Sequence, residues 1–149
     1  MSISIREANL NDVAAIADFQ VRMAMETEDK KLDSAVVNTA VEAVFADATK
    51  GFYIVGESEG IVVSSLLVTY EWSDWRNCNM WYIQSVYVTK EHRAKGAFKN
   101  MYQRVLEMAK KDGSMYVRLY VEVENIRAQK TYEALGMKRM PYYMYDVEV

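Results

Sequence analysis

Two hydrophobic patterns follow one another at the start of the chain. Residues 2–7 alternate between apolar and polar side chains, which predicts a short strand. A helix is then expected from Asn9 or Asn11 to about Glu26, because apolar residues recur there every three or four positions. A polar loop follows, after which Asp33 is expected to cap a second amphipathic helix.

Beyond Gly51 the pattern becomes typical of strands. Apolar and β-branched runs at 52–56, 61–70 and 80–88 predict three strands. The polar stretch at 71–79 carries two tryptophans and predicts a connection between the last two of them.

The rest of the chain predicts two more helices and further strands. An apolar stripe at three- and four-residue spacing predicts a helix that ends near Gly113. A strand at 116–123, a short helix at 126–135 and one or two strands at 137–148 are expected after it. This order of elements predicts a mixed α+β domain over residues 1–149.

Composition limits the class of protein. The chain has 149 residues, 51% of them hydrophobic, which is enough for one globular domain with a substantial core. A single cysteine, Cys78, and a single histidine, His92, exclude a disulfide framework and make a metal site unexpected. No apolar run reaches the roughly 18–20 residues of a membrane span, and the start of the chain does not resemble a signal peptide. We therefore expect a soluble cytoplasmic protein.

The net charge of −3 combines two halves of opposite sign. Residues 1–80 contain 13 acidic and 6 basic side chains, a net charge of −7. Residues 81–149 contain 8 acidic and 12 basic side chains, a net charge of +4. Such a split is either a chance distribution of surface charge or a sign that one half binds an anion and the other a cation.

Residues 84–99 contain the most informative chemistry. Here a strand leads through a basic, glycine-containing turn into a helix. A helix N-terminus presents unpaired N–H groups and the positive end of the helix dipole, and Gly96 allows a ligand to approach the backbone closely. The basic side chains around it are Lys90, Arg93, Lys95 and Lys99. These features predict a phosphate site, although a solvated basic turn would have the same sequence.

Two motifs follow one another in this half of the chain. Arg93, Gly96 and Phe98 form the pattern R-x-x-G-x-F after a hydrophobic strand. The pattern N-x-x-A-x-x-x-Y-x-x-x-G-M is formed by Asn125, Ala128, Tyr132, Gly136 and Met137. In order and separation they resemble the acetyl-CoA and tyrosine motifs of the GCN5-related N-acetyltransferase (GNAT) family, except that Phe98 stands where Gly or Ala is usual. The resemblance implies the acyl-CoA N-acyltransferase (GNAT-like) fold, with a single mixed, mostly antiparallel sheet flanked by helices.

The resemblance also implies a site for acetyl-CoA as cosubstrate. A bulge near Ser85–Tyr87 would direct backbone N–H groups into a gap between two splayed strands. The pantetheine arm would bind there to the backbone of Val86 and Val88, and the pyrophosphate would bind to the backbone of residues 93–98. The implied cofactor-binding residues are Val86, Tyr87, Val88, Arg93, Ala94, Lys95, Gly96, Ala97, Phe98, Lys99, Asn125 and Tyr132.

Tyr132 and Asn125 each have a functional and a structural interpretation. Tyr132 resembles the family's tyrosine that protonates the departing CoA thiolate, but its spacing also suits the apolar face of a helix. Asn125 would hydrogen-bond the pantetheine, cap a helix, or do both.

Gln84 departs from the family at the general base. Many members place a glutamate near this position, and glutamine cannot accept the proton that an ammonium acceptor must lose. Gln84 can still position a water or the acceptor in catalysis. The proton would leave through a water chain or to another carboxylate, for which the candidates are Glu71, Asp74, Glu122 and Glu26.

The resemblance offers a role for the acidic half of the chain. In this fold the first two helices, their connecting loop and the 71–79 connection usually shape the acceptor pocket. Acidic and aromatic side chains suit a cationic amine, although ordinary solvated loops have the same residues. The implied acceptor-binding residues are Glu26, Glu71, Trp72 and Trp75.

The sequence thus predicts an acetyl-CoA-dependent N-acetyltransferase that transfers the acetyl group directly to a primary amine of a small molecule or peptide. One alternative, motivated by Gln84 and Phe98, is a non-catalytic acyl-CoA-binding or regulatory module on the same fold. A nucleic-acid binder is disfavoured by the isoelectric point of about 5.3, and no membrane partner is expected. A homodimer is left open, since a set of tyrosines suits either an interface or a pocket: Tyr82, Tyr87, Tyr142, Tyr143 and Tyr145.

Overall fold

The structure is a computed structural model that describes residues 2–149 of a chain with two compact units, Met1–Leu119 and Tyr120–Val149. The first unit contains a five-stranded sheet. Its strands are β1 (Ser4–Glu7), β2 (Phe52–Ser58), β3 (Ile61–Ser73), β4 (Cys78–Val88) and β5 (Val117–Arg118). Its helices are α1 (Val13–Glu28), α2 (Ser34–Ala46) and α3 (Ala97–Asp112), with short 3-10 helices η1 (Leu10–Asp12) and η2 (Lys90–His92).

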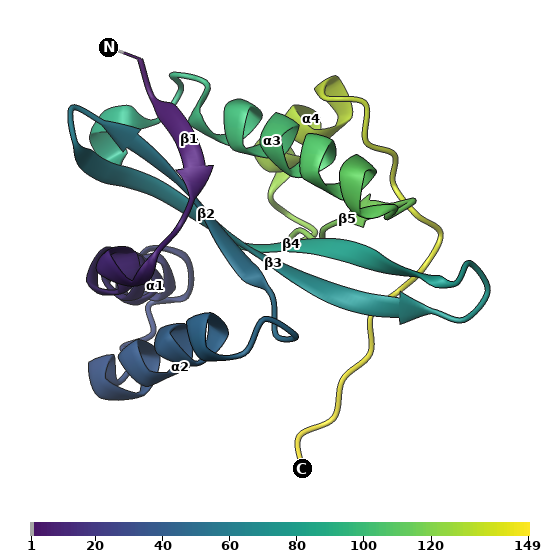
Figure 1. The fold of residues 1–149 in the computed structure, drawn as a ribbon, viewed down its shortest axis with the longest axis horizontal. Coiled ribbons are helices and arrows are strands. Elements are labelled where there is room, and N and C mark those ends of the chain that lie inside the picture. Colours follow the sequence, from purple (N-terminus) through teal and green to yellow (C-terminus); the bar gives the residue numbers. More distant parts are fainter. Residues whose placement is uncertain (1) are drawn as a thin grey trace. The chain divides into compact units, whose positions relative to one another are not determined.

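The five strands lie side by side in chain order. β1 to β4 are antiparallel neighbours, whereas β5 runs parallel to β4. Figure 1 shows this sheet with α3 on one face and with α1 and α2 on the other. The expected α+β class, with a single and mostly antiparallel sheet flanked by helices, is therefore confirmed.

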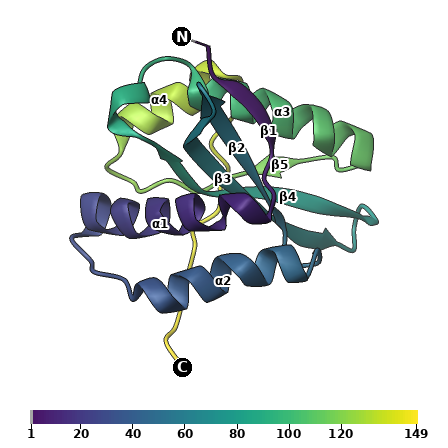
Figure 2. The ribbon, with the colours of Figure 1, turned by 60° about the vertical axis from the view of Figure 1, so that its left-hand side comes forward.

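Alternation along β2 divides its side chains between these two layers. Tyr53 and Val55 share a core cluster with α1 and α2, to which the helices contribute Val13, Ile16, Ala17 and Val41. Because neighbouring side chains on a strand point to opposite faces, Phe52 and Ile54 face α3. The two helical layers are seen on either side of the sheet in Figure 2.

Asn9, rather than Asn11, begins the first helical segment. The Asn9 side chain accepts a hydrogen bond from the backbone N–H of Asn11 at 2.9 Å, and Asp12 Oδ2 accepts one from the backbone N–H of Asn9 at 2.8 Å. Asp33 caps α2 as expected, because its Oδ1 accepts a hydrogen bond from the backbone N–H of Ala35 at 2.9 Å. Both caps satisfy N–H groups that the helices leave unpaired.

The connection predicted at 71–79 is wrong in length. β3 continues to Ser73 and β4 begins at Cys78, so the hairpin loop contains only residues 74–77. The strand ends were not predicted because their side chains are mostly polar and show no apolar alternation. This end of the hairpin is largely solvated, so its backbone can pair without an apolar face.

Two strand predictions in the last third of the chain are also wrong. β5 keeps only two residues of the strand expected at 116–123, and residues 137–148 form no strand. An alternating run forms a strand only where a neighbouring edge pairs with its backbone, and the pairing of β5 with β4 ends at Tyr82 and Arg118. The exposed side chains of Tyr142, Tyr143 and Tyr145 belong to the unpaired segment.

The second unit contains α4 (Ile126–Ala134), where a short helix is expected. Asn125 caps it, because its Oδ1 accepts a hydrogen bond from the backbone N–H of Ala128 at 3.1 Å. Gly136, with a φ of +94°, follows the end of the helix. Among residues 2–149, every helix is too short or too polar to cross a bilayer.

Candidate functional site

A bulge interrupts β4 where the resemblance predicts one. Ser65 and Leu67 are two residues apart on β3, but their partners on β4, Tyr87 and Gln84, are three residues apart. One extra residue is therefore inserted in β4, and Ser85 adopts a positive φ of +52°. The predicted bulge is confirmed.

The extra residue turns Tyr87 towards α1. Residues directly opposite each other share a face, so Gln84 lies on the face of Leu67, which packs against the α1–α2 cluster. Without the bulge, Val86 would occupy this face in place of Tyr87. The Tyr87 ring is only 4% exposed, and its centroid lies 5.1 Å from that of Phe19 on α1.

β4 and β5 separate after two paired positions. The ladder joins Trp81 to Val117 and Tyr82 to Arg118, whereas β4 continues to Val88. Within residues 2–119, no further strand pairs with this side of β4. The ladder therefore ends before the bulge, and the backbone of β4 around the bulge has no strand partner on this side within residues 2–119. An unpaired strand edge of this kind suits an extended ligand.

Local hydrogen bonds hold the turn that follows β4. The backbone N–H of Thr89 donates to a β3 carbonyl at 2.9 Å, and Thr89 Oγ1 lies 2.8 Å from His92 Nδ1. Ala94 and Gly96 have φ values of +59° and +82°, in a turn of the kind that directs backbone N–H groups to one side. A Cβ added to Gly96 would meet no atom within 4 Å, so a ligand has room to approach the start of α3.

Phe98, the exception in the first motif, packs along α3. Its ring centroid lies 6.0 Å from that of Tyr102, one helical turn further on. This contact places an aromatic ring beside the helix rather than across its N-terminus.

The carboxylate of Glu26 reaches this turn from the end of α1. Its Oε2 lies 2.7 Å from Arg93 Nη2, and its Oε1 accepts a hydrogen bond from the Tyr87 hydroxyl at 3.0 Å. Lys90 Nζ lies 3.9 Å from the same Oε1. The guanidinium of Arg93 holds the pKa of Glu26 below its usual value. Glu26, which was expected to bind the acceptor, therefore contacts Tyr87 and Arg93, which were expected to bind the cofactor.

The Gln84 side chain is hydrogen-bonded within the sheet. Its amide Nε2 donates to Thr69 Oγ1 on β3. Gln84 and Tyr87 therefore lie on the α1–α2 face of the sheet, one on each side of the bulge. This place for Gln84 is compatible with its expected role, the positioning of a water or an acceptor.

The other expected acceptor residues lie at the far end of β4. Glu71 pairs with Met80 near the hairpin loop, eight strand positions and about 26 Å from Val88. Trp72 lies beside it on β3, and the Trp75 side chain in the loop is 88% exposed. The structure does not bring these three residues together with Glu26.

The second unit carries Tyr132 on α4 and Glu122 ahead of it. Burial raises the pKa of the Tyr132 hydroxyl above its usual value, so this group stays protonated at neutral pH. Glu122 Oε2 accepts a hydrogen bond from the backbone N–H of Glu124 at 3.0 Å, which gives this carboxylate a local structural partner.

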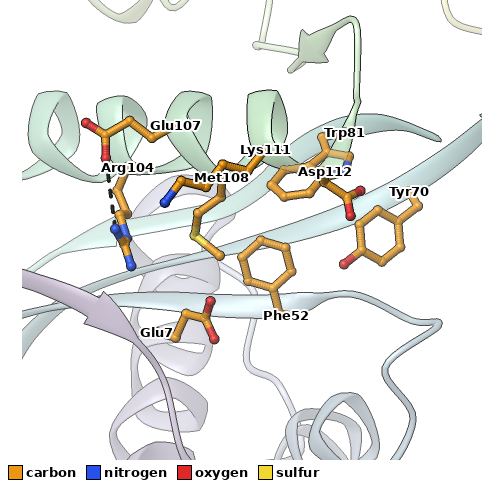
Figure 3. A pocket seen from close by; sticks show the side chains of 9 residues that line it. All are labelled: Glu7, Phe52, Tyr70, Trp81, Arg104, Glu107, Met108, Lys111 and Asp112. Atoms are coloured by element: carbon orange, nitrogen blue, oxygen red, sulfur yellow. Dashed lines mark ion pairs between the residues drawn. The ribbon is translucent and has the colours of Figure 1, made fainter. Parts of the chain in front are cut away.

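A cavity of about 560 Å³, which no pattern in the sequence predicts, lies beside the C-terminal half of α3 (Figure 3). It is lined by Glu7, Phe52, Tyr70, Trp81, Arg104, Glu107, Met108, Lys111 and Asp112. Its aromatic residues come from three different strands, so no single run of sequence marks it. The nearest lining residue of α3, Arg104, is eight positions and about 12 Å along the helix from Gly96. The cavity is therefore separate from the turn.

Comparisons with known proteins agree with this geometry. The model of the acetyltransferase (GNAT) family matches residues 16–137. A possible acetyltransferase from Clostridium difficile 630 is 45% identical, with 100% of this chain and 99% of that chain covered and a TM-score of 0.92. No curated protein matches the chain significantly.

More distant solved structures share the fold. The ribosomal-protein-alanine N-acetyltransferase of Brucella melitensis biovar Abortus 2308 is 15% identical, with 99% of this chain and 100% of that chain covered and a TM-score of 0.79. The glucosamine-6-phosphate N-acetyltransferase of Arabidopsis thaliana is 20% identical, with 99% of each chain covered and a TM-score of 0.76.

Proposed function

Because the chain belongs to the acetyltransferase (GNAT) family, we propose that it is an acetyl-CoA-dependent N-acetyltransferase acting on a primary amine of a small molecule or peptide. One observation carries this proposal: the bulge in β4 leads directly into an open turn at Gly96. A backbone site of this kind suits a ligand with an extended amide arm joined to a pyrophosphate.

The proposed cofactor site uses the backbone more than the side chains. The pantetheine amides would pair with β4 at Val86 and Val88, where this side of the strand has no strand neighbour within residues 2–119. The pyrophosphate would lie against the turn at Ala94 and Gly96, at the positive end of the α3 dipole. Because backbone N–H groups do not depend on side-chain identity, Phe98 is compatible with this site.

The proposed reaction forms one C–N bond and breaks one C–S bond. A neutral amine attacks the thioester carbonyl, whose oxygen accepts a hydrogen bond from a backbone N–H at the bulge. The CoA thiolate then leaves and takes a proton from the hydroxyl of Tyr132, which recovers a proton from the solvent that received the amine proton. The Tyr132 hydroxyl holds its proton at neutral pH, and because burial raises its pKa, the transfer depends on the basic thiolate that develops beside it.

We assign removal of the amine proton to solvent. Gln84 cannot accept a proton, and the lowered pKa of Glu26 makes its carboxylate a weak base at neutral pH. Glu71 lies near the hairpin end of β4, far from the bulge. We therefore propose a water positioned by Gln84, rather than Glu26 or Glu71, as the route for the proton on this face of the sheet.

The names of two structural neighbours support an amine acceptor. They are N-acetyltransferases of ribosomal-protein alanine and of glucosamine-6-phosphate. These acceptors belong to different chemical classes, and proteins of one fold differ widely in substrate. The proposal therefore stays at the level of a primary amine.

A panel of amines tests the proposed function. The chain is incubated with acetyl-CoA and with polyamines, amino sugars, amino acids or short peptides, and free CoA is measured. We expect CoA release that requires both chain and amine, with an equal amount of acetylated amine by mass spectrometry. If acetyl-CoA binds but no amine accelerates CoA release, the non-catalytic acyl-CoA-binding module replaces the enzyme. Acetylated protein formed without acceptor would contradict direct transfer.

A further inference from the structure

The side chain of Glu26 connects α1 to both ends of the proposed cofactor site. One carboxylate oxygen binds the Tyr87 hydroxyl, directly after the bulge, and the other binds Arg93 in the turn. The Glu26 side chain is 27% exposed, so these bonds are partly shielded from water. A single carboxylate thus links α1 to the end of β4 and to the turn that follows it.

Arg93 is held from three directions. Its Nη2 lies 2.7 Å from Glu26, and its Nε donates to the backbone carbonyl of Val88 at 2.9 Å. Its guanidinium carbon lies 5.5 Å from the centroid of the Tyr87 ring. The planar guanidinium is therefore fixed against the end of β4 by contacts within the protein.

We propose that Glu26 is a positioning residue for the pyrophosphate site, which it acts on through Arg93 and Tyr87 by holding the turn against the bulge. This inference rests on the proposed function. It reassigns Glu26, which the sequence placed with the acceptor, to the cofactor side. In this proposal Arg93 stabilises the turn and does not bind the phosphate. The phosphate is bound instead by the backbone N–H groups of the turn and by Lys95 and Lys99.

Removing the charge of Glu26 distinguishes this role from competition with the phosphate and from contact with the acceptor, because each predicts a different change in the affinity for acetyl-CoA. If Glu26 holds the turn, Glu26→Gln weakens binding of acetyl-CoA. If Glu26 competes with the phosphate for Arg93, the same change frees the guanidinium and strengthens binding. If Glu26 contacts the acceptor, binding of acetyl-CoA is unchanged and the KM for the amine rises.

Isothermal titration calorimetry with acetyl-CoA measures this direction. We expect Glu26→Gln to raise the Kd about three- to fivefold, the upper part of the range for a partly exposed charged pair. Glu28→Gln, an exposed glutamate on the same last turn of α1, is the matched control and is expected to change the Kd by less than about twofold. Tyr87→Phe, which removes only the hydroxyl, is expected to act in the same direction as Glu26→Gln but less strongly.

A second ligand locates the effect. S-acetylpantetheine lacks the pyrophosphate, so its affinity is expected to be the same in the wild type and in Glu26→Gln. Arg93→Gln and the double variant complete a cycle, and the two losses are expected not to add, because both break one contact. A change confined to thermal stability, with the Kd for acetyl-CoA unaltered, would mark Glu26 as merely structural.

The outcomes separate this inference from the proposed function. If the wild type does not bind acetyl-CoA, the proposed function fails and the inference fails with it. If the wild type binds and Glu26→Gln binds equally well or more tightly, only the role of Glu26 is overturned. An equal loss of affinity for S-acetylpantetheine would also overturn it, because the pyrophosphate would not be involved.

Discussion

Tyr132 and Gln84 have different parts in the proposed reaction: Tyr132 donates a proton, whereas Gln84 only positions a water or the acceptor. Burial raises the pKa of the Tyr132 hydroxyl, which therefore gives up its proton only as the basic thiolate develops beside it. The Gln84 amide donates a hydrogen bond to Thr69 and does not ionise, so it cannot act as a general base. A substitution of Tyr132 therefore removes a proton donor. A substitution of Gln84 removes the side chain that is proposed to position a water or the acceptor.

Tyr132→Phe is expected to lower kcat by about a hundredfold, the lower range for loss of a general acid. The Kd for acetyl-CoA should change little, because the substitution removes only a hydroxyl. Steady-state CoA release and calorimetry give the two values. A kcat within about twofold of the wild type would remove Tyr132 from the chemistry.

Asp12 provides a test of stability away from the site. Its carboxylate is buried and makes two hydrogen bonds to the Arg6 guanidinium, of 2.7 and 3.0 Å, which lower the pKa of Asp12. The stability that this pairing supplies is complete above the unfolded pKa of about 4 and is lost as the pH falls through the lower folded pKa.

Asp12→Asn is therefore expected to reduce the free energy of unfolding by about 2 kcal/mol at pH 7. Urea unfolding at decreasing pH measures the difference between the wild type and the variant. The difference is expected to narrow below about pH 4. A difference that stays constant across this range would show that the charge of Asp12 is not responsible.

At the scale of elements, prediction succeeded where a segment carries its own signals. The caps at Asn9 and Asp33 and the apolar stripe before Gly113 are local, and the helices begin or end as they indicate. The strand expected at 116–123 needed backbone pairing with β4, and β4 pairs with this segment at only two positions. The hairpin strands within 71–79 lacked an apolar face and so lacked a pattern.

The same distinction holds for the candidate site. The glycine turn was predicted from one continuous stretch of sequence, and the bulge was predicted from the resemblance to the family. The contact of Glu26 with Arg93 joins residues 67 positions apart. Its contact with Tyr87 depends on the bulge, which turns that side chain towards α1. No periodicity in the sequence marks such a contact.

The two glycines that flank α3 allow a matched test of the turn. Gly96 and Gly113 have φ values of +82° and +80°, and an added Cβ meets no atom within 4 Å at either position. Alanine at either position should therefore cost a similar amount of stability, about 1 kcal/mol. We expect only Gly96→Ala to weaken acetyl-CoA binding, by about tenfold or more, because its Cβ lies where the phosphate approaches. Equal affinities in the two variants would place the phosphate elsewhere.

At the scale of the whole chain, the split of charge is less simple than two separate binding halves. Glu26 from the acidic half pairs with Arg93 and lies near Lys90, both from the basic half. Part of the positive charge of the turn is thus neutralised within the protein. What remains for an anion is the backbone at the start of α3 together with Lys95 and Lys99, which are exposed.

Titration of the wild-type chain with acetyl-CoA tests the central claim most directly. We expect saturable binding of one molecule per chain, with a Kd between about 1 μM and 1 mM, weakening as salt is added because the ligand is anionic. Thermal stability should rise with acetyl-CoA concentration in parallel. If millimolar acetyl-CoA gave neither heat of binding nor stabilisation, the bulge and the turn would not be a cofactor site.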